Sequence, residues 1–225
     1  MSASALFYLT ASTLIDLTGR VALVTGGGTS IGYMIAQGLA TNGARVYISG
    51  RREPVLAKAA QEFKGRGELI PLLMNVTSKA SILAAKTIIG AANGRLNILV
   101  NDAGQSGPLS AWMSGASAPQ DGDAMRRHAS AEKQDTFDVK KASWADLFAI
   151  DTFDPFFVTT AVLQTAVIGL LKGSERHGAW TASVINVTSM SGSLKLAWSL
   201  FAYGASKAAT AHLTRMLATE LARAR

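Results

Sequence analysis

The chain has 225 residues, of which 48% are hydrophobic and 16% are charged. This length and composition predict a single folded domain with a sizeable core and exclude a disordered chain. The net charge is +7, but the basic residues are scattered, which indicates a solvated basic surface rather than a nucleic-acid site. Part of this charge can serve an anionic cofactor.

Other classes of protein are disfavoured by what the sequence lacks. No apolar run reaches the roughly 18–20 residues that a membrane-spanning helix needs, so we expect no membrane partner. Residues 1–17 contain no basic n-region, which favours a cytoplasmic location over secretion. The chain has no cysteine, so disulfides, cysteine-ligated zinc and a cysteine nucleophile are excluded. We predict no metal site.

Short apolar runs alternate with helix-like segments along the chain. The runs predict strands at residues 21–25, 45–49, 69–76, 97–100 and 183–187. The segments predict helices at residues 31–42, 54–64, 78–92, 143–171 and 203–223. Continuous apolar strands separated by helices are typical of a parallel sheet that is buried on both faces. The sequence therefore predicts an α/β fold with a doubly wound, Rossmann-like parallel sheet.

One stretch departs from this alternation. Residues 105–142 are rich in Gly, Ser, Ala, Asp and Lys and show little periodicity, so they predict a long loop before the helix at 143. Loops of this length in compact domains are usually functional or mobile. A surface excursion without a role is the simpler interpretation.

A glycine-rich turn joins the first predicted strand to the first predicted helix. Glycines let the backbone approach a pyrophosphate, and the N-terminus of a helix offers N–H donors and the positive end of its dipole. The turn therefore predicts a nucleotide site, although a strand–helix turn without a ligand is the alternative. The candidate residues are Gly26, Thr29, Ser30, Ile31 and Gly32.

Two arginines follow the second predicted strand. A domain selective for NAD usually carries an acidic residue near this point, for the ribose hydroxyls. Arg51 and Arg52 suit a 2′-phosphate instead, because guanidinium groups pair well with phosphate. We therefore expect NADP(H) to be preferred, with NAD(H) possible. The alternative is that both side chains are simply exposed.

Tyr203 and Lys207 are four residues apart on the last predicted helix. Residues at this spacing share one face of a helix, so the lysine can stabilise a tyrosine anion. A tyrosine in this situation can act as an acid or base near neutral pH. The spacing alone also fits a surface aromatic beside a surface amine.

The motifs appear in a specific order. They are Thr25-Gly26 with Gly32, Asn101-Asp102-Ala103-Gly104 after the fourth strand, Ser189 after the fifth, and Tyr203-x-x-x-Lys207. In this order they resemble the short-chain dehydrogenase/reductase family, over nearly the whole chain from about Thr18 to Arg225. The glycine turn, Gly50-Arg-Arg and Ser189-x-x-Gly192 look like a fungal-type branch similar to 3-oxoacyl-carrier-protein reductases.

The resemblance implies an oxidoreductase that reduces a carbonyl, or oxidises the matching alcohol, by hydride transfer with NADP(H). Tyr203 would be the acid/base, Lys207 would lower its pKa and bind the nicotinamide ribose, and Ser189 would polarise the carbonyl. Asp151 would stand in the proton-relay position. The remaining cofactor contacts would come from Asn75, Val76, Asn101, Ala103 and Gly104. One NAD(P)-binding domain would then cover 1–225, with a cofactor half at 18–104, the loop at 105–142 and a catalytic half at 143–225.

Four positions depart from the family pattern. Ser30 replaces a glycine, so that a Cβ there would crowd the phosphate or demand an unfavourable backbone angle, unless its hydroxyl donates a hydrogen bond. Asn75 replaces an aspartate, and Asp102 replaces an asparagine that normally braces the sheet. Asp151 also replaces an asparagine. We expect its carboxylate to pair with Lys207, to weaken the effect of the lysine on Tyr203 and to slow the proton relay.

The resemblance also implies strands beyond the helix at 203–223, and we expect these last strands to be missing from the sheet. If they are supplied, a homo-oligomer is expected. The substrate would be a small-molecule carbonyl or alcohol. A catalytically impaired Rossmann-like protein that binds a nucleotide or a partner is the alternative function.

Overall fold

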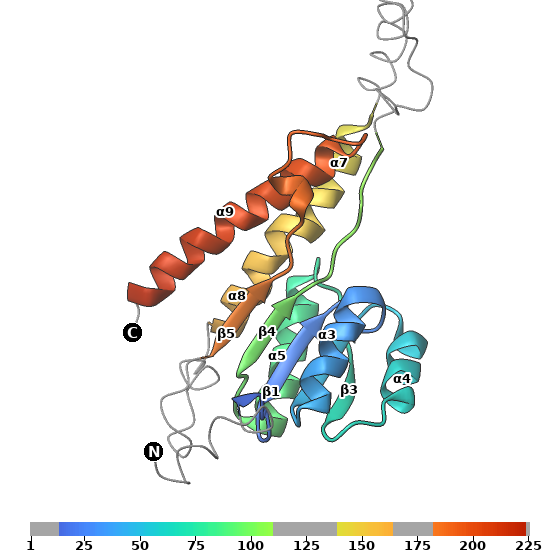
Figure 1. Ribbon diagram of the computed structural model, residues 1–225, viewed down its shortest axis with the longest axis vertical. Helices are drawn as coiled ribbons and strands as arrows, with labels where there is room; N and C mark the ends of the chain where they lie inside the picture. Colours follow the sequence, from blue (N-terminus) through green and yellow to red (C-terminus); the bar gives the residue numbers. More distant parts are fainter. Residues whose placement is uncertain (1–13, 110–138, 164–181, 224–225) are drawn as a thin grey trace, which may run out of the picture. The chain divides into compact units, whose positions relative to one another are not determined.

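The computed structural model describes residues 14–109, 139–163 and 182–223 (Figure 1). These residues fall into two compact units, which are described separately. The first unit is Met1–Ala103 with Phe157–Ile185, and the second is Gly104–Phe156 with Asn186–Arg225. The predicted single domain with its halves stays a prediction.

A five-stranded sheet has the order β3-β2-β1-β4-β5. The strands are β1 Val21–Thr25, β2 Arg45–Gly50, β3 Glu68–Leu73, β4 Ile98–Asn101 and β5 Ser183–Asn186. β1 pairs in parallel with both β2 and β4, so that Ala22 lies between Val46 and Ile98. β2 and β3 are also parallel. The predicted Rossmann-like α/β fold is confirmed.

Helices connect and extend these strands. In the first part of the chain they are α3 Ser30–Thr41, α4 Glu53–Glu62 and α5 Lys79–Asn93. Later come α7 Lys141–Phe148, a π-helical turn η1 at Ala149–Phe153, α8 Asp154–Leu163, a 3₁₀ turn η2 at Met190–Gly192 and α9 Phe201–Arg223. None of the helices in the described ranges combines the length and the hydropathy that a bilayer crossing needs.

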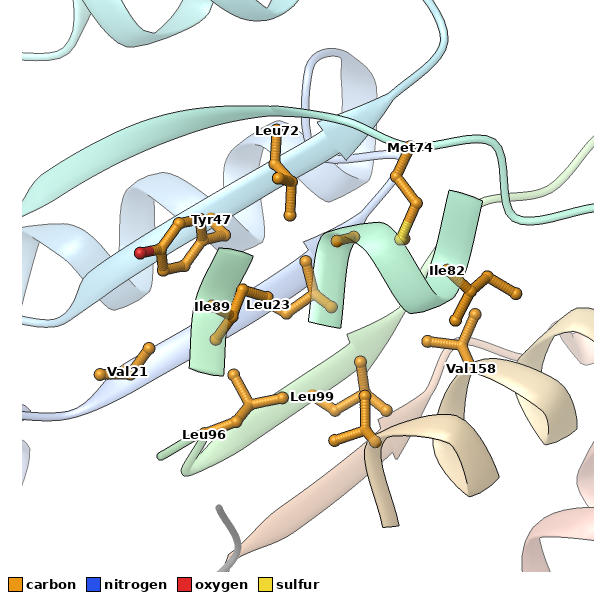
Figure 2. Packing of buried hydrophobic residues seen from close by; sticks show 12 residues of the cluster. Val21, Leu23, Tyr47, Leu72, Met74, Ile82, Ile89, Leu96, Leu99 and Val158 are labelled. Carbon is orange, nitrogen blue, oxygen red and sulfur yellow. The ribbon is translucent and has the colours of Figure 1, made fainter. Parts of the chain in front are cut away.

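The core lies on both faces of the sheet because alternate side chains of a strand point in opposite directions. On one face Leu23 and Leu99 pack with Ile82 and Ile89 of α5, and Val158 of α8 joins the same cluster (Figure 2). The alternate residues of β1 and β2 are fully buried too, and α3 contacts both of these strands. This double covering explains why the strands are apolar throughout.

Most element boundaries differ from the prediction by one or two residues, and the end of β3 differs by three. β3 ends at Leu73 rather than at 76, because Asn75 Oδ1 accepts hydrogen bonds from the N–H and the hydroxyl of Thr77 and so forms a turn. The helix expected from 143 begins at Lys141. Most of the expected loop at 105–142 lies outside the described residues, as does 164–171 of the expected helix.

The long helix predicted for 143–171 is wrong as a continuous α-helix. Pro155 has no N–H to donate to the carbonyl of Asp151, and its ring would clash with that carbonyl in a regular helix. The chain forms a π turn instead, in which Asp154 N–H bonds to Ala149 O. Such π turns are frequent at functional sites, and this one contains Asp151.

Candidate active site

The glycine turn of the first unit requires glycine at two positions. Gly26 has φ +70°, and a Cβ on it would lie 3.1 Å from the backbone N of Ala103. A Cβ on Gly32, in the first turn of α3, would lie 2.6 Å from both Gly26 O and Asp102 Oδ2. The turn is therefore pressed against the end of β4. This packing gives the strand–helix turn the glycine positions that a phosphate-binding turn uses.

The first residues of α3 are exposed and not capped by a side chain. Thr29 is the N-cap residue in an extended conformation, and its hydroxyl makes no capping hydrogen bond. Ser30 has φ +50°, in the left-handed region that favours glycine. The expectation of an unfavourable backbone angle at this position is confirmed. The exposed helix end, with Ile31 beside it, offers N–H donors to an anion.

Thr25 fixes the start of the Asn101–Gly104 run. Its hydroxyl oxygen accepts hydrogen bonds of 3.0 Å from the backbone N–H groups of both Asp102 and Ala103. Asn101 is buried and donates through Nδ2 to Thr159 Oγ1 at 3.2 Å. The Thr25 hydroxyl therefore braces the backbone of this segment. Thr25 lies within the glycine motif, but its hydroxyl was not predicted to have this role.

The remaining candidate cofactor residues of the first unit follow β2 and β3. Arg51 and Arg52 are exposed just beyond β2, and in the described part of the chain neither guanidinium is engaged by a carboxylate. Asn75 and Val76 are half-buried beyond β3. The Asn75 side-chain oxygen is already bonded to Thr77, so only its amide group is left to face a ligand.

In the second unit, Tyr203 and Lys207 lie one turn apart on α9. Lys207 is buried, with 6% of its surface exposed, and its Nζ lies 5.6 Å from the centre of the Tyr203 ring. Nζ also donates to the backbone carbonyl of Val187 at 3.3 Å, just beyond β5. The structure therefore brings the predicted tyrosine and lysine together.

Ser189 lies next to α9 because the turn that follows it, η2, packs against this helix at Gly192. A Cβ on Gly192 would lie 2.7 Å from Ala208 N and 2.8 Å from the carbonyl carbon of Lys207. Only glycine allows the 3₁₀ turn η2 to touch α9 this closely, which gives the Ser-x-x-Gly spacing a physical reason. Ser189 Oγ accepts from Ser191 N–H at 3.2 Å and so caps this turn. Its hydroxyl proton is left to donate elsewhere.

Asp151 also belongs to this cluster. Its carboxylate is buried, and Oδ2 lies 3.4 Å from Lys207 Nζ. Oδ1 accepts from the N–H of Gln105, one residue beyond Gly104, at 3.0 Å. Burial raises the pKa of the Asp151 carboxyl, while the Lys207 ammonium and the Gln105 N–H oppose that rise. The pairing that the sequence predicted is present.

Three further groups complete the cluster and were not predicted. Thr210 Oγ1 donates to the backbone carbonyl of Asp151 at 2.6 Å, which is the carbonyl that Pro155 leaves without its helical donor. The Gln105 amide and the Val187 carbonyl bind through their backbones. Thr210 alone had a sequence signal, because it lies three residues after Lys207 on the same helix.

The solved structures that resemble this chain share its fold. One is the RhlG/NADP active-site complex from Pseudomonas aeruginosa, with 31% identity and a TM-score of 0.68 over 92% of this chain and 68% of that one. The protein is thus of the Rossmann-like class, with a parallel sheet covered by helices.

The sequence comparisons identify the family within this class. Residues 20–225 match the family model described as short chain dehydrogenase. Two fungal relatives are the short-chain dehydrogenases/reductases VdtF of Byssochlamys spectabilis and PhomF of Diaporthe leptostromiformis. VdtF is 37% identical, and the match covers 95% of this chain and 72% of VdtF. PhomF is 33% identical, and the match covers 98% of this chain and 71% of PhomF. The chain belongs to the short-chain dehydrogenase/reductase family of oxidoreductases, which bind NAD(P) and act on small molecules.

Proposed function

We propose that this protein is an NADP(H)-dependent oxidoreductase that reduces a carbonyl or oxidises the matching alcohol. The observation that carries the proposal is the cluster on α9, where a buried lysine lies 5.6 Å from the ring of a half-buried tyrosine. An ammonium beside a phenol favours the phenolate, which gives the tyrosine a use in proton transfer.

The cofactor residues are proposed from the first unit. The glycine turn with Gly26 and Gly32 would approach the pyrophosphate, because it joins β1 to the N-terminus of α3, which has no side-chain cap. The N–H groups of Ser30 and Ile31 in the first turn of α3 would face the phosphates. Arg51 and Arg52 would hold the 2′-phosphate of NADP(H), since both guanidinium groups are exposed and unengaged within the described residues. The solved RhlG/NADP active-site complex, which this chain resembles, supports this preference.

Further cofactor contacts are proposed at the ends of the strands. Asn75 and Val76 would flank the adenine, and Asn101, Ala103 and Gly104 would line the nicotinamide side. Thr25 would hold this last segment in place through its two backbone hydrogen bonds. When bound, the nicotinamide supplies or accepts the hydride.

The catalytic roles are proposed for the second unit. Tyr203 would give its phenolic proton to the carbonyl oxygen during reduction and take it back during oxidation. Ser189, whose hydroxyl proton is not used in the cap of η2, would donate to the same oxygen and polarise the carbonyl. Lys207, held by Val187 O, would stabilise the phenolate and bind the ribose.

A second candidate is a nucleotide-binding member of the family with impaired turnover. One observation favours it: the carboxylate of Asp151 engages Lys207 at 3.4 Å and offsets part of its charge. Intact Ser189, Tyr203 and Lys207 favour the enzyme.

The test is the oxidation of NADPH in the presence of a panel of ketones and aldehydes. We expect wild-type protein to turn over at least one of them, and Tyr203→Phe to be slower by about a hundredfold or more, in the range of general acid catalysis. Because Tyr203→Phe removes only the hydroxyl, it should still bind NADPH, which a thermal shift measures. NADPH binding without turnover by the wild type would support the second candidate instead.

A further inference from the structure

Asp151 occupies a place where a charge is costly. The residue is 1% exposed, and the three residues of α9 that contact it, Ser206, Lys207 and Thr210, are buried as well. A buried carboxylate requires either a partner of opposite charge or several hydrogen-bond donors. The contacts of Asp151 therefore show which groups stabilise its buried carboxylate.

The carboxylate gathers donors from two separate segments. Gln105 N–H donates to Oδ1 at 3.0 Å, from the stretch that follows β4. Lys207 Nζ and Ser206 Oγ, both on α9, lie 3.4 Å from Oδ2. The side chain thus ties α9 to the segment that begins at Gly104. These contacts are made by the side chain of Asp151. Its backbone carbonyl makes a separate hydrogen bond, with Thr210.

The Lys207 ammonium interacts with two acceptors. An ammonium has three N–H donors. Within the described residues, two of them have acceptors: Asp151 Oδ2 and the Val187 carbonyl, at 3.3 Å. The anion is the stronger acceptor of the two, because charge-assisted hydrogen bonds exceed neutral ones. The carboxylate therefore offsets part of the electrostatic effect that the ammonium has on Tyr203.

We infer that Asp151 is a positioning residue whose buried carboxylate holds Lys207 in place and sets the pH at which the Tyr203–Lys207 pair works. This inference rests on the proposed function. Among the described residues, the printed partners of its carboxylate are Gln105, Ser206 and Lys207, so it acts on the tyrosine through the lysine.

Two buried titratable groups concern Asp151. Asp154, three residues further along the chain, is buried too, but it is not among the groups that shift the pKa of Asp151. The other group is Lys207. Among the described residues, Lys207 is the one charged side chain that faces the carboxylate from α9, and His212 on the same helix is exposed. On α7 the charged side chains Lys141 and Asp146 are exposed to solvent. Burial raises the pKa of the Asp151 carboxyl, which makes its charge sensitive to the state of Lys207.

The kinetic test compares pH–rate profiles for alcohol oxidation by wild-type protein and Asp151→Asn. Asparagine keeps the acceptor for Gln105 N–H but removes the negative charge. We expect the rising limb of the profile to move to lower pH by about one unit, because Lys207 then acts on Tyr203 unopposed. The matched control, Asp146→Asn, removes an exposed carboxylate on α7 and should leave the profile unmoved. A profile of Asp151→Asn that superimposes on the wild type would overturn the inference.

A second test does not use activity. Urea unfolding is measured for Asp151→Asn, Lys207→Gln and the double variant. Each single change leaves one buried charge without its partner, so we expect the double variant to be more stable than either single variant. Losses of stability that simply add would show that the two charges do not act together, and would contradict the inference.

The two tests separate this inference from the proposed function. If no carbonyl or alcohol is turned over by the wild type but the double variant regains stability, the ion pair stands and the proposed function fails. If turnover is present and the charges are independent, the proposed function stands and the role of Asp151 fails.

Discussion

Ser30 carries a side chain where the backbone favours glycine. Its φ of +50° places it in the left-handed region, at the start of the helix whose N-terminus we assign to the pyrophosphate. A residue with a Cβ pays about 1–2 kcal/mol in this conformation. The strain therefore lies at a proposed binding position, where unusual backbone angles are often found.

Replacing Ser30 by glycine should stabilise the protein. Glycine relieves the left-handed strain but loses more freedom on folding, so we expect a net gain of about 0.5–1 kcal/mol in the free energy of unfolding. Urea unfolding measures it. The control is Ser143→Gly, inside α7, where the same exchange should cost about 0.5 kcal/mol. Equal or lower stability of Ser30→Gly would show that the serine hydroxyl stabilises the turn.

At the scale of elements, the π turn η1 makes a hydrogen bond to α9. Pro155 removes the helical donor for the Asp151 carbonyl, and Thr210 of α9 supplies one from outside the helix. The same turn buries Asp154 at the start of α8. Within the described residues no donor reaches Asp154 Oδ2, and burial raises the pKa of this carboxyl to about 7.

Stability should therefore fall as pH rises through the range in which Asp154 ionises. The folded protein binds this proton up to a pH of about 7, whereas the unfolded chain releases it near the ordinary aspartate pKa of 3.8. The unfolded state thus binds fewer protons between these values, so the free energy of unfolding decreases with pH across the window and stays lower above it.

The variant Asp154→Asn should remove this dependence. At pH 8 we expect it to be more stable than the wild type by about 1–2 kcal/mol, and at pH 4 to be about equal. Thermal or urea unfolding at the two pH values measures the difference. Asp146→Asn, which changes an exposed carboxylate, serves as the control and should follow the wild type. The same difference at both pH values would mean that packing rather than charge is responsible.

At the scale of the whole molecule, the order of motifs predicted the fold well. Apolar strands buried on two faces leave few alternatives to a doubly wound sheet, and β1 has the predicted bounds. The differences arise at single residues. Asn75 forms a turn before the expected end of β3, and Pro155 interrupts the long helix.

The residue types of the candidate site and two of its side-chain contacts could be predicted, but the hydrogen bonds made by backbone groups could not. Tyr203 and Lys207 share a helix face because of their spacing, so their proximity followed from sequence. The pairing of Asp151 with Lys207 was expected only from the family pattern. Bonds made by the backbone of Gln105 and Val187 carry no side-chain signal, so they were visible only once the chain was folded.

The most direct test of the central claim follows the hydride itself. Wild-type protein is incubated with NADPH that carries deuterium at the transferable position and with a carbonyl that it reduces, and the alcohol is analysed by mass spectrometry. We predict one cofactor-derived deuterium per alcohol molecule, and faster transfer from NADPH than from NADH, because Arg51 and Arg52 favour the 2′-phosphate. An alcohol without the label would contradict the assignment.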